Sequence, residues 1–519
     1  MIHPYSHYTA RAARRWPAKV ALIDGDRRRT YFEVDRRATQ LARALVARGV
    51  EPGDRVALVQ ENRIEYIETV VAIARAGGVI VPLLGALTAT EHAFMVGDAE
   101  AKFVIALSAG TASRAVEAAG DERKVLCLES AEGGFDLGAE ADAESADPMS
   151  IDRPPSSLAQ ILYTSGTTGH PKGVTHSYAS VAAAMGAWAN ACSVGPEDRV
   201  LGQLALSHFG GRGMDACWVA GATMVILREA DPKGMLHAIE EHRITMILVI
   251  PTLLRMLLDH PDAAAADLSS LRAVVYAAAP AAPALVRRSL ERLGPVLHTG
   301  FGQTEAYGLN TFMGPAEHVE ALEAGESRLA SVGRECAAFA QVRICDDNGE
   351  ELPGGEVGEI CVCAPWATPG FWKRPELDRA RLQDGWLRTG DLGRMDDRGY
   401  VFLADRMEDK IITGGFNVYP AEVEGALAEH PAIAECAVFA IPDPKWGEAI
   451  RAAVTLRPGQ SVDAEELIAF CKERLARFKV PKAIDVLEEL PKSGVGKILR
   501  RELRDPWWEG EMHGVHGAE

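Results

Sequence analysis

The sequence predicts an α/β fold with doubly wound, largely parallel sheets, followed by a region of short strands and a small α+β unit. Three observations lead to this prediction. Apolar runs of strand length alternate with amphipathic helical segments over roughly the first 330 residues. Short strands and turn sequences follow from residue 331, and helices mix with strands again after residue 406. A chain of 519 residues is also too long for one compact core.

The individual elements follow from local patterns. Residues 35–49 have helical periodicity and end at a glycine, 55–59 form a buried strand, and 64–76 form a second amphipathic helix. Further strand-length apolar runs lie at 103–107, 159–163, 223–227 and 246–250. We expect a surface connection at the acidic residues 129–155. Turn sequences at 346–349, 353–355 and 396–399 favour a small β-barrel or distorted sheet, 420–429 favours a helix, and we expect a partly disordered tail from 505.

Charge and hydropathy exclude two classes of partner. The net charge is −18 at pH 7, so a long polyanion such as a nucleic acid would be repelled. No apolar run approaches the length of a membrane-spanning helix.

The first 23 residues contain basic side chains and no acid, a pattern that a mitochondrial transit peptide shares. We expect instead that these residues form one face of a first helix; they are Arg11, Arg14, Arg15 and Lys19.

Nine cysteines are scattered singly, apart from Cys361 and Cys363, which lie two positions apart and so share one face of a strand-like run. A zinc site would need a second pair at ligand spacing. The cysteines therefore predict reduced thiols and a cytoplasmic protein.

A glycine-rich segment is the most informative part of the sequence. Residues 163–173 read Y-T-S-G-T-T-G-H-P-K-G. Backbone N–H groups of such a turn form a concave anion site, and hydroxyl and ammonium groups complete a polyphosphate cradle. A Walker A loop has Gly directly before its Lys, whereas Pro171 precedes Lys172 here. This composition alone is also typical of a flexible linker.

Three further segments argue against a linker. They are G-F-G-Q-T-E at 300–305, G-W-L-R-T-G-D at 385–391 followed by A-D-R-M-E-D-K-I at 404–411, and P-K-S-G-V-G-K-I-L-R at 491–500. In this order the four segments resemble the adenylate-forming superfamily, which comprises acyl-CoA synthetases, adenylation domains of peptide synthetases and beetle luciferases. The resemblance runs from residue 6 to about residue 504.

The resemblance implies a large N-terminal domain, residues 1–405, with two doubly wound α/β subdomains and a small β-barrel at about 331–404. A small mobile α+β domain, residues 406–519, would follow and rotate between two half-reactions. In the first, a carboxylate attacks the α-phosphate of ATP and gives an acyl-adenylate and pyrophosphate. In the second, a thiol displaces AMP. Both steps gather negative charge, so catalysis should rest on cations and preorganised donors.

The resemblance also assigns the nucleotide site. The glycine-rich loop holds the β- and γ-phosphates, Thr304 contacts the α-phosphate, and Glu305 with Thr168 holds Mg²⁺. Phe301 replaces the tyrosine that relatives place against adenine and keeps its ring face. Asp391 accepts hydrogen bonds from the ribose, which Arg406 also approaches. The ATP-binding set is Thr164, Ser165, Gly166, Thr167, Thr168, Gly169, Lys172, Ala279, Phe301, Gly302, Gln303, Asp391 and Arg406.

Lys497 matches the lysine that reaches the α-phosphate and the carboxylate during adenylation. The pivot of the domain rotation falls on Glu408, where relatives carry Asp or Lys. Lys497 also lies in a pattern that resembles sites of lysine acetylation in bacterial relatives, so a lysine acetyltransferase is one expected partner.

We expect the acyl group to bind among His208, Phe209, Gly210, Leu248, Ala277, Ala278 and Gly300. His208 matches a gate between the acyl group and the thiol tunnel, although a lone histidine is more often structural. Arg212 is the one cation there, and it could simply pair with Asp215. The other residues are small or apolar, which favours a hydrophobic monocarboxylate. Medium-chain and aryl acids both remain open, with a lean towards aryl acids.

The resemblance extends to coenzyme A. Gly414, Gly415 and Asn417 would line the pantetheine tunnel, where glycines permit close approach. Trp446 and Phe478 match aromatic residues that stack on the CoA adenine in some aryl-CoA ligases, with Lys482 near the phosphates. Both aromatic residues could equally belong to the core of the small domain.

We therefore predict an ATP-dependent carboxylate–CoA ligase that uses ATP, Mg²⁺ and CoA. One alternative is a stand-alone adenylation enzyme that loads a carrier protein. An alternative of another class is a nucleotide-binding regulatory ATPase, which would release ADP. If the chain self-associates, we expect a homodimer.

Overall fold

The computed structural model describes residues 1–59, 61–121, 124–129, 135–164, 171–279, 281–323, 327–336, 340–406, 409–413, 416–492 and 498–508. The chain forms two compact units. The first comprises Met1–Val342 and Cys361–Thr389, and the second Arg343–Ile360 and Gly390–Glu519. The division between residues 405 and 406, which concerns movement during the reaction, stays a prediction.

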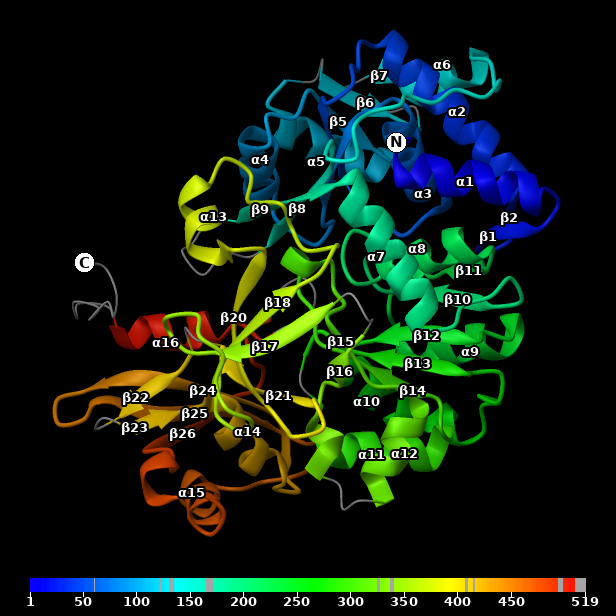
Figure 1. The fold of residues 1–519 in the computed structure, drawn as a ribbon. Coiled ribbons are helices and arrows are strands. Elements are labelled where there is room, and N and C mark those ends of the chain that lie inside the picture. Colours follow the sequence, from blue (N-terminus) through cyan, green and yellow to red (C-terminus); the bar gives the residue numbers. More distant parts are fainter. Residues whose placement is uncertain are drawn as a thin grey trace. The chain divides into compact units, whose positions relative to one another are not determined.

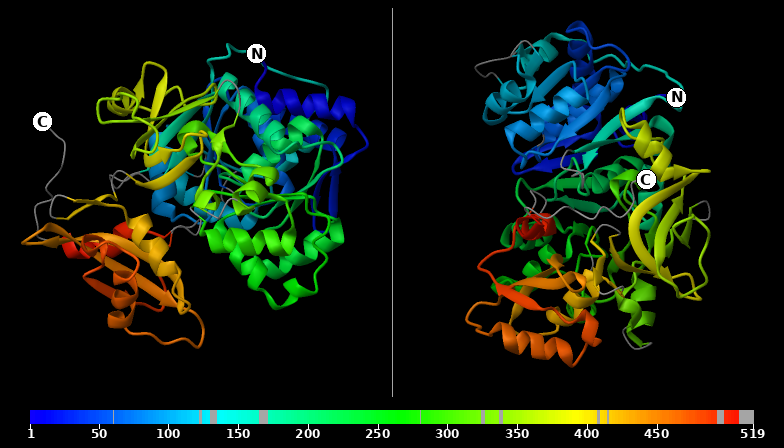
Figure 2. Two further views of the ribbon diagram at one scale, coloured as in Figure 1. Left: turned by 60° about the horizontal axis from the view of Figure 1, so that its bottom comes forward. Right: turned by 90° about the vertical axis from the view of Figure 1, so that its left-hand side faces the viewer.

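The first unit contains two seven-stranded sheets (Figures 1 and 2). In one sheet the spatial order is β7 (Phe135–Asp136), β6 (Val125–Cys127), β5 (Phe103–Ala106), β3 (Arg55–Val59), β4 (Val79–Leu83), β8 (Leu158–Thr164) and β9 (Lys172–Ser177). Neighbouring strands are parallel except β8 and β9, which form an antiparallel pair at one edge.

In the other sheet the order is β14 (Leu297–Thr299), β13 (Ala273–Tyr276), β12 (Met246–Val249), β10 (Arg199–Gly202), β11 (Thr223–Ile226), β1 (Val20–Asp24) and β2 (Arg27–Thr30). Only β1 and β2 are antiparallel. Two strands from the beginning of the chain thus complete a sheet whose other strands lie about 200 residues later, as Figure 1 shows.

Helices cover both faces of each sheet. The two inner faces share one core with α1 (Pro4–Arg15), α2 (Tyr31–Ala47), α3 (Ile64–Arg75), α7 (Tyr178–Ala191) and α8 (Gly211–Ala220). The outer face of the first sheet packs on α4 (Ala89–Asp98) and α5 (Ala109–Ala119), and that of the second on α9 (Pro232–His242), α10 (Pro251–Asp259), α11 (Pro283–Leu293) and α12 (Pro315–Glu323). Alternation along β3 produces this layering, because Val56 and Leu58 enter the shared core while Ala57 and Val59 face α4 and α5.

Short elements follow the two sheets. The 3-10 helices are η2 (Pro261–Ala264), η3 (Thr304–Ala306) and η4 (Ser327–Ala330), and β15 (Thr311–Phe312) pairs with β16 (Arg334–Glu335). A five-stranded sheet then has the order β17 (Gln341–Cys345), β18 (Gly358–Cys363), β20 (Trp386–Met395) and β19 (Leu382–Gln383), with β21 (Val401–Arg406) also paired to β20; α13 (Pro375–Arg381) precedes β19. The prediction of a small strand-rich region is confirmed.

The second unit is built on another five-stranded sheet. Its order is β23 (Phe416–Val418), β22 (Ile411–Thr413), β25 (Gly447–Leu456) and β24 (Ile433–Asp443), with β26 (Ala483–Val486) beside β25. On one face, Val438 packs with α14 (Pro420–Ala428) and α15 (Ala464–Lys472). On the other, Phe439 packs with α16 (Arg500–Trp508). The short helix η5 (Arg477–Lys479) precedes β26.

Most expected elements are confirmed, and two are corrected. The helix expected at 35–49 begins at Tyr31, because the Thr30 side chain caps it and Glu33 bonds back to the Thr30 backbone. The surface connection expected at 129–155 is wrong at 135–143, which form β7 and α6 (Leu137–Ala143) with Leu137 and Ala141 buried, whereas residues 144–155 are exposed or half-buried.

At the N-terminus, Arg11, Arg14 and Arg15 lie in a helix, α1, as expected, whereas Lys19 lies beyond the end of this helix at Arg15. The predicted disordered tail is helical as far as Trp508, and residues 509–519 lie outside the described part. Among the described residues, no helix has the length and apolar character needed to cross a membrane.

Candidate active site

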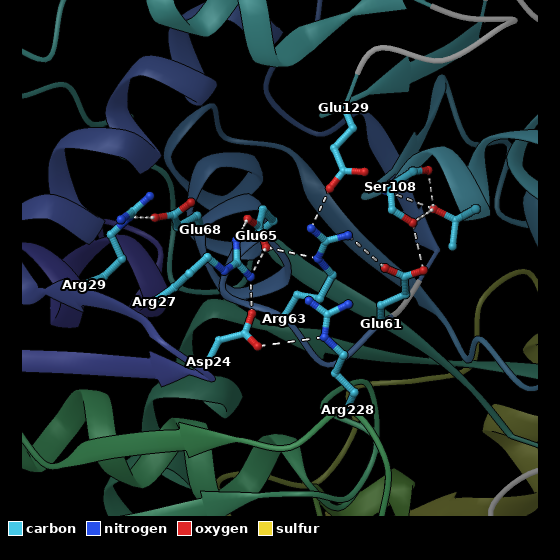
Figure 3. A network of polar contacts seen from close by, with 11 residues as sticks. Asp24, Arg27, Arg29, Glu61, Arg63, Glu65, Glu68, Ser108, Glu129 and Arg228 are labelled. Atoms are coloured by element: carbon cyan, nitrogen blue, oxygen red, sulfur yellow. Dashed lines mark hydrogen bonds and ion pairs between the residues drawn. The ribbon is translucent and has the colours of Figure 1, made fainter.

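Both large sheets have a carboxyl edge, where parallel strands place their following loops together. At the edge of the first sheet those loops are filled by their own ion pairs (Figure 3). Arg63 bonds Glu61, Glu65 and Glu129, and Ser108 donates to Glu61 at 2.9 Å. Because the charges satisfy one another, the loops after β3, β5 and β6 at this edge form a structural network rather than a ligand site.

The carboxyl edge of the second sheet carries the motifs that sequence analysis singled out. Tyr276 of β13 lies beside Thr299 of β14 in the parallel register. The chain therefore leaves both strands side by side, into Ala277 on one strand and Gly300 on the other. Thr299 strengthens the junction, since its hydroxyl donates to the Tyr276 carbonyl oxygen at 2.8 Å.

At two positions of the loop at 300–305, only glycine fits, because a side chain would collide with neighbouring backbone. A Cβ at Gly300 would lie 2.4 Å from the Thr311 carbonyl oxygen, and a Cβ at Gly302 would lie 2.2 Å from the carbonyl carbon of Gly308. These neighbours are backbone atoms, which cannot move aside as the end of a flexible side chain can. Phe301 lies between them with 6% of its surface exposed, and its N–H donates to the Thr311 hydroxyl at 3.0 Å. Its stacking on adenine stays a prediction.

The loop continues into η3, whose first two residues are the predicted phosphate and metal contacts. The Thr304 carbonyl oxygen accepts a hydrogen bond from His176 Nε2 at 2.9 Å. The Glu305 carbonyl oxygen accepts one from the Thr368 N–H at 2.6 Å. Among the described residues, the Glu305 carboxylate has no hydrogen-bond or ion-pair partner. The backbone is therefore fixed while a hard oxygen donor remains available.

The predicted phosphate loop connects β8 to β9. Thr164 and Lys172 are directly opposite in the antiparallel ladder, so they are the last pair before the loop. Ser165, Gly166, Thr167, Thr168 and Gly169 lie outside the described residues. The hairpin stem nevertheless shows where the loop must begin and end.

The stem of this hairpin is held from both sides. The Tyr163 hydroxyl donates to Asp98 Oδ2 at 2.7 Å, and the Gly173 carbonyl oxygen accepts from the Trp372 N–H at 2.7 Å. A Cβ at Gly173 would lie 2.9 Å from the Ile161 side chain. Burial and the Asp98 contact raise the pKa of Tyr163 well above its usual value, so its hydroxyl stays a donor.

The expected acyl-pocket residues are only partly brought together. Leu248 is buried in the shared core, whereas Ala278 and Ala279 are exposed and Ala277 and Gly300 are half-buried. Ala278 has a φ of 70°, which is unusual for a residue other than glycine. Its backbone conformation is thus strained at the point where the sheet edge meets the predicted adenylate.

His208 lines a small pocket of a different composition. Its other lining residues are Pro82, Leu84, Leu87, Met95, Leu162, Tyr163 and Ser207. None of Leu248, Ala277, Ala278 and Gly300 belongs to it. Pro82 belongs to β4, and Leu162 and Tyr163 belong to β8, the first strand of the phosphate hairpin, so the pocket borders the hairpin stem. Next to it, Gly210 and Phe209 lead into α8, and a Cβ at Gly210 would lie 2.3 Å from the Leu204 carbonyl oxygen.

Arg212, the cation expected near the acyl group, pairs with Asp215, as the sequence suggested. Arg212 Nη1 lies 3.0 Å from Asp215 Oδ2, and both side chains are buried. The guanidinium also lies 3.8 Å above the Tyr307 ring. Arg212 is therefore part of the packing behind the site.

The predicted ribose contacts come together on the second unit. Asp391 of β20 is directly opposite Arg406 of β21 in their antiparallel ladder. In the first unit, Gln303 Nε2 donates to the Thr389 carbonyl oxygen at 3.2 Å, two residues before Asp391 in the chain. Of the Arg406 side chain the structure says nothing.

The predicted CoA contacts are exposed rather than part of a core. Trp446 is 41% and Phe478 39% exposed, and the Lys482 ammonium lies 5.8 Å from the Trp446 ring centroid. Sequence analysis missed Phe416, which is 56% exposed and stacks on Phe478 at 4.7 Å. Phe416 could have been predicted from the sequence, since it is an aromatic residue within the segment expected to line the pantetheine tunnel. Gly414, Gly415 and the Asn417 side chain lie outside the described part.

Lys497 and Glu408 also lie outside the described residues. The segment that contains Lys497 is closed by an antiparallel bridge between Lys492 and Ile498. The roles of both residues stay predictions.

Comparison with protein families decides the wider assignment. Residues 9–372 match the model of the AMP-binding enzymes, and residues 422–497 match the model of their C-terminal domain. The chain belongs to the AMP-binding enzyme family. The first match contains the phosphate hairpin, His208 and η3, and the second ends at Lys497. It is thus an acid–thiol ligase of the AMP-forming acyl-CoA synthetase family, and it binds ATP.

Individual relatives of this adenylate-forming chain differ in what they act on. It is 34% identical to the medium/long-chain-fatty-acid–CoA ligase FadD8 of Mycobacterium tuberculosis, over 98% of this chain and 91% of that one. It is 36% identical to a feruloyl-CoA synthase of an Amycolatopsis species, over 96% and 98% of the two chains. It is 35% identical to the fatty acid–[acyl-carrier-protein] ligase ScoC of Streptomyces coeruleorubidus, over 96% and 95%.

A solved structure confirms the fold. The amide bond synthetase McbA from Marinactinospora thermotolerans has a TM-score of 0.88 and 32% identity, over 97% of this chain and 100% of that one. The α/β prediction with a strand-rich region and an α+β C-terminal part is therefore correct.

Proposed function

We propose that this chain is an ATP-dependent carboxylate–CoA ligase that acts on a hydrophobic aryl or medium-chain monocarboxylic acid. The observation that carries the proposal is the link between the β8–β9 hairpin and η3. One strand of the hairpin presents Lys172 at the predicted phosphate loop, and the same strand bonds the backbone of Thr304. The two segments that would handle the triphosphate are thus held together.

In the first half-reaction the carboxylate oxygen attacks the α-phosphorus, and the bond to pyrophosphate breaks. We assign Lys172 and the loop before it to the β- and γ-phosphates, and Thr304 to the α-phosphate. Asp391 and Arg406 would hold the ribose. Each group acts by binding and orienting charge, which is how most of the rate of phosphoryl and acyl transfer is obtained.

Glu305 fits a magnesium ion. Mg²⁺ in nucleotide sites is usually bound by one or two carboxylates together with substrate phosphates, not by a cage of protein ligands. No group of three or more potential ligands occurs among the described residues, while the Glu305 carboxylate is unpaired within that part. When bound, the ion would neutralise charge on the phosphates, and Glu305 would orient it.

In the second half-reaction the CoA sulfur attacks the acyl carbon, and the bond to AMP breaks. The exposed aromatic surface formed by Phe416, Trp446 and Phe478 supports a CoA nucleotide contact. Lys445 lies 4.5 Å from the Trp446 ring centroid, and Lys482 also lies near this ring, so cations are available for phosphates. Exposed aromatic rings with adjacent ammonium groups suit an adenine nucleotide.

The acid itself is the least constrained part of the proposal. The small residues at the ends of β13 and β14 leave room for an elongated group, and relatives include both fatty-acid and feruloyl enzymes. We lean towards aryl acids. The nine free cysteines support a cytoplasmic location.

A second candidate function is transfer of the acyl group to a carrier protein, which the likeness to the ScoC ligase favours. The test incubates the enzyme and ATP with acetate, octanoate, benzoate or 4-coumarate, and with CoA or a carrier protein. We expect acid-dependent AMP and pyrophosphate, followed by acyl-CoA. Transfer to a carrier protein alone would favour the second candidate, ADP would refute adenylation, and a preference for acetate would refute a hydrophobic substrate.

A further inference from the structure

The histidine that bonds Thr304 comes from the strand that follows the phosphate loop. His176 lies on β9, four residues after Lys172, and its side chain is fully buried. Its Nε2 lies 2.9 Å from the Thr304 carbonyl oxygen. One short strand therefore begins at the predicted triphosphate contact and, near its other end, holds the residue before Glu305.

The protonation state of this histidine makes the direction of the bond definite. Burial lowers the pKa of His176 to about 3, and the hydrogen bond to Thr304 only partly opposes this effect. The ring is therefore neutral at working pH and carries one N–H. A carbonyl oxygen can only accept, so Nε2 is the donor. Within the described part of the chain, the other ring nitrogen, Nδ1, has no hydrogen-bond partner.

The ring has little freedom to turn. It packs edge-on against Tyr307, with centroids 4.8 Å apart and planes at 86°. Tyr307 is itself fixed, because its hydroxyl lies 3.1 Å from that of Tyr5 and the Arg212 guanidinium lies over its ring. Tyr307 has a φ of 50°, so the chain reverses sharply at the end of η3, directly behind Glu305.

A second tie joins the same strand to the next residue of η3. The Thr368 N–H bonds the Glu305 carbonyl oxygen, and the Thr368 hydroxyl donates to the Thr175 carbonyl oxygen at 2.7 Å. Two consecutive carbonyl groups of η3 are thus attached to two consecutive residues of β9, one directly and one through Thr368. Among the described residues, the Thr304 hydroxyl and the Glu305 carboxylate have no such anchoring contact.

We infer that His176 is a positioning residue that aligns the metal-binding segment Thr304–Glu305 with the phosphate hairpin. The inference rests on the proposed roles of the hairpin and of Glu305. His176 does not touch the nucleotide in this account. It acts through the Thr304 backbone, and losing its donor lets η3 shift relative to Lys172.

The test compares two replacements of this histidine. His176→Phe keeps an aromatic ring against Tyr307 but removes the donor. His176→Gln loses the ring but places an amide N–H close to the position of Nε2. His92→Phe is the matched control, because His92 is also fully buried and its Nε2 lies 2.9 Å from a backbone carbonyl oxygen, that of Leu84. Like that of His176, the Nδ1 of His92 has no hydrogen-bond partner among the residues that the structure describes.

Three quantities are measured for each protein. Calorimetry gives the affinity for ATP with and without Mg²⁺, pyrophosphate release gives the rate of adenylation, and supplied acyl-adenylate with CoA gives the second half-reaction. For His176→Phe we expect adenylation to fall about 10- to 100-fold, the size of effect that a misplacement near 1 Å produces. The gain in ATP affinity from Mg²⁺ should shrink, the second half-reaction should persist, and His176→Gln should recover most of the loss.

His92→Phe should lower thermal stability without changing the effect of Mg²⁺ on ATP affinity. The inference is wrong if His176→Phe matches this control, or if His176→Gln is as impaired as His176→Phe. The inference is equally wrong if, in His176→Phe, the rates of both half-reactions and the thermal stability all fall together. A wild-type enzyme that releases no AMP with any acid would instead overturn the proposed function, so the two failures are distinguishable.

Discussion

Asp391 and Arg406 are directly opposite each other across the β20–β21 ladder, although fifteen positions separate them in the chain. An antiparallel pair in direct register is the shortest way to bring two backbone positions together from separate strands. Both residues were expected at one ribose from sequence motifs alone. The ladder explains how two motifs that are not adjacent in sequence can serve one ligand.

This relationship predicts how Asp391 contributes to nucleotide choice. Asp391→Ala should raise the KM for ATP by about 10- to 100-fold, because a hydrogen bond to a charged group contributes about 1.5–3 kcal/mol. It should also abolish the preference for ATP over 2′-deoxy-ATP, measured as a ratio of kcat/KM. Asp396→Ala, in the turn after β20, is the control and should affect stability only. An unchanged preference in Asp391→Ala would remove the ribose assignment.

Lys497→Ala should suppress adenylation by at least about 100-fold, the scale of a lost preorganised charge. Thioester formation from supplied acyl-adenylate should survive, because the lysine would be turned away in that step. The control is Lys492→Ala, whose ammonium pairs with Glu435 at 2.8 Å on the same unit. Equal loss in both half-reactions would contradict domain rotation. Acetylated Lys497 should behave as the alanine variant does.

The exposed aromatic surface predicts a CoA-specific defect. Trp446→Ala and Phe416→Ala should each raise the KM for CoA by about 5- to 100-fold, since a base stacked on an aromatic ring contributes about 1–3 kcal/mol. Pyrophosphate release without CoA should stay at the wild-type rate. Trp507→Ala is the matched control, because Trp507 is 44% exposed on the same unit but lies over Arg451. A defect of equal size in Trp507→Ala would argue against a specific CoA contact.

Glu68 predicts a pH dependence of stability. Burial raises the pKa of Glu68 to about 7, and Arg29, at 3.6 Å, only partly compensates. The folded protein therefore binds a proton that the unfolded chain releases above about pH 4.5. The stability linked to this carboxyl is complete below that pH and is lost as the pH rises through about 7, by about 3 kcal/mol at most.

Chemical denaturation between pH 5 and 8 measures this effect. Glu68→Gln should be more stable than the wild type at pH 8, with the difference shrinking towards pH 5. Glu65→Gln, one helical turn away, is the control of opposite sign. There burial raises the pKa, but the bond from Arg27, a backbone hydrogen bond and the charges of Arg63 and Arg27 together outweigh it. The pKa of Glu65 is therefore lowered, and loss of its charge should destabilise the protein at pH 8. A parallel response of both variants would contradict the assignment.

The sequence was most informative where local chemistry is sufficient. The strand at 55–59 was predicted with its observed bounds, because a short apolar run between polar residues indicates a buried strand. The earlier start of α2 could also have been found, since Thr30 and Glu33 have the spacing of a capping box. The helix α6 could not, because its stability comes from packing against α2 about a hundred residues away, and its own sequence is short and acidic.

The site shows the same division. Motifs identified the phosphate hairpin, η3 and the ribose pair. His176 and Thr368 were not identified, because each is a single common residue whose partner lies far away in the chain. The expected acyl wall at Leu248 is buried, since alternation along β12 directs this side chain into the shared core. Side-chain direction at a sheet edge depends on register, which motif spacing does not specify.

The tie between β9 and the segment around Gly370 also has a consequence for synthesis of the chain. β9 is an edge strand, and its outer backbone groups pair with the segment around Gly370, where Thr175 bonds Gly370, 195 positions later, and Gly173 bonds Trp372. At ordinary rates of translation that interval is about 10 to 40 s. During it the nascent sheet presents an unprotected edge of the kind that pairs with other chains. The segment at 368–372 therefore covers this edge only late in synthesis. Nascent chains whose translation stops before this segment should be prone to aggregate on the ribosome.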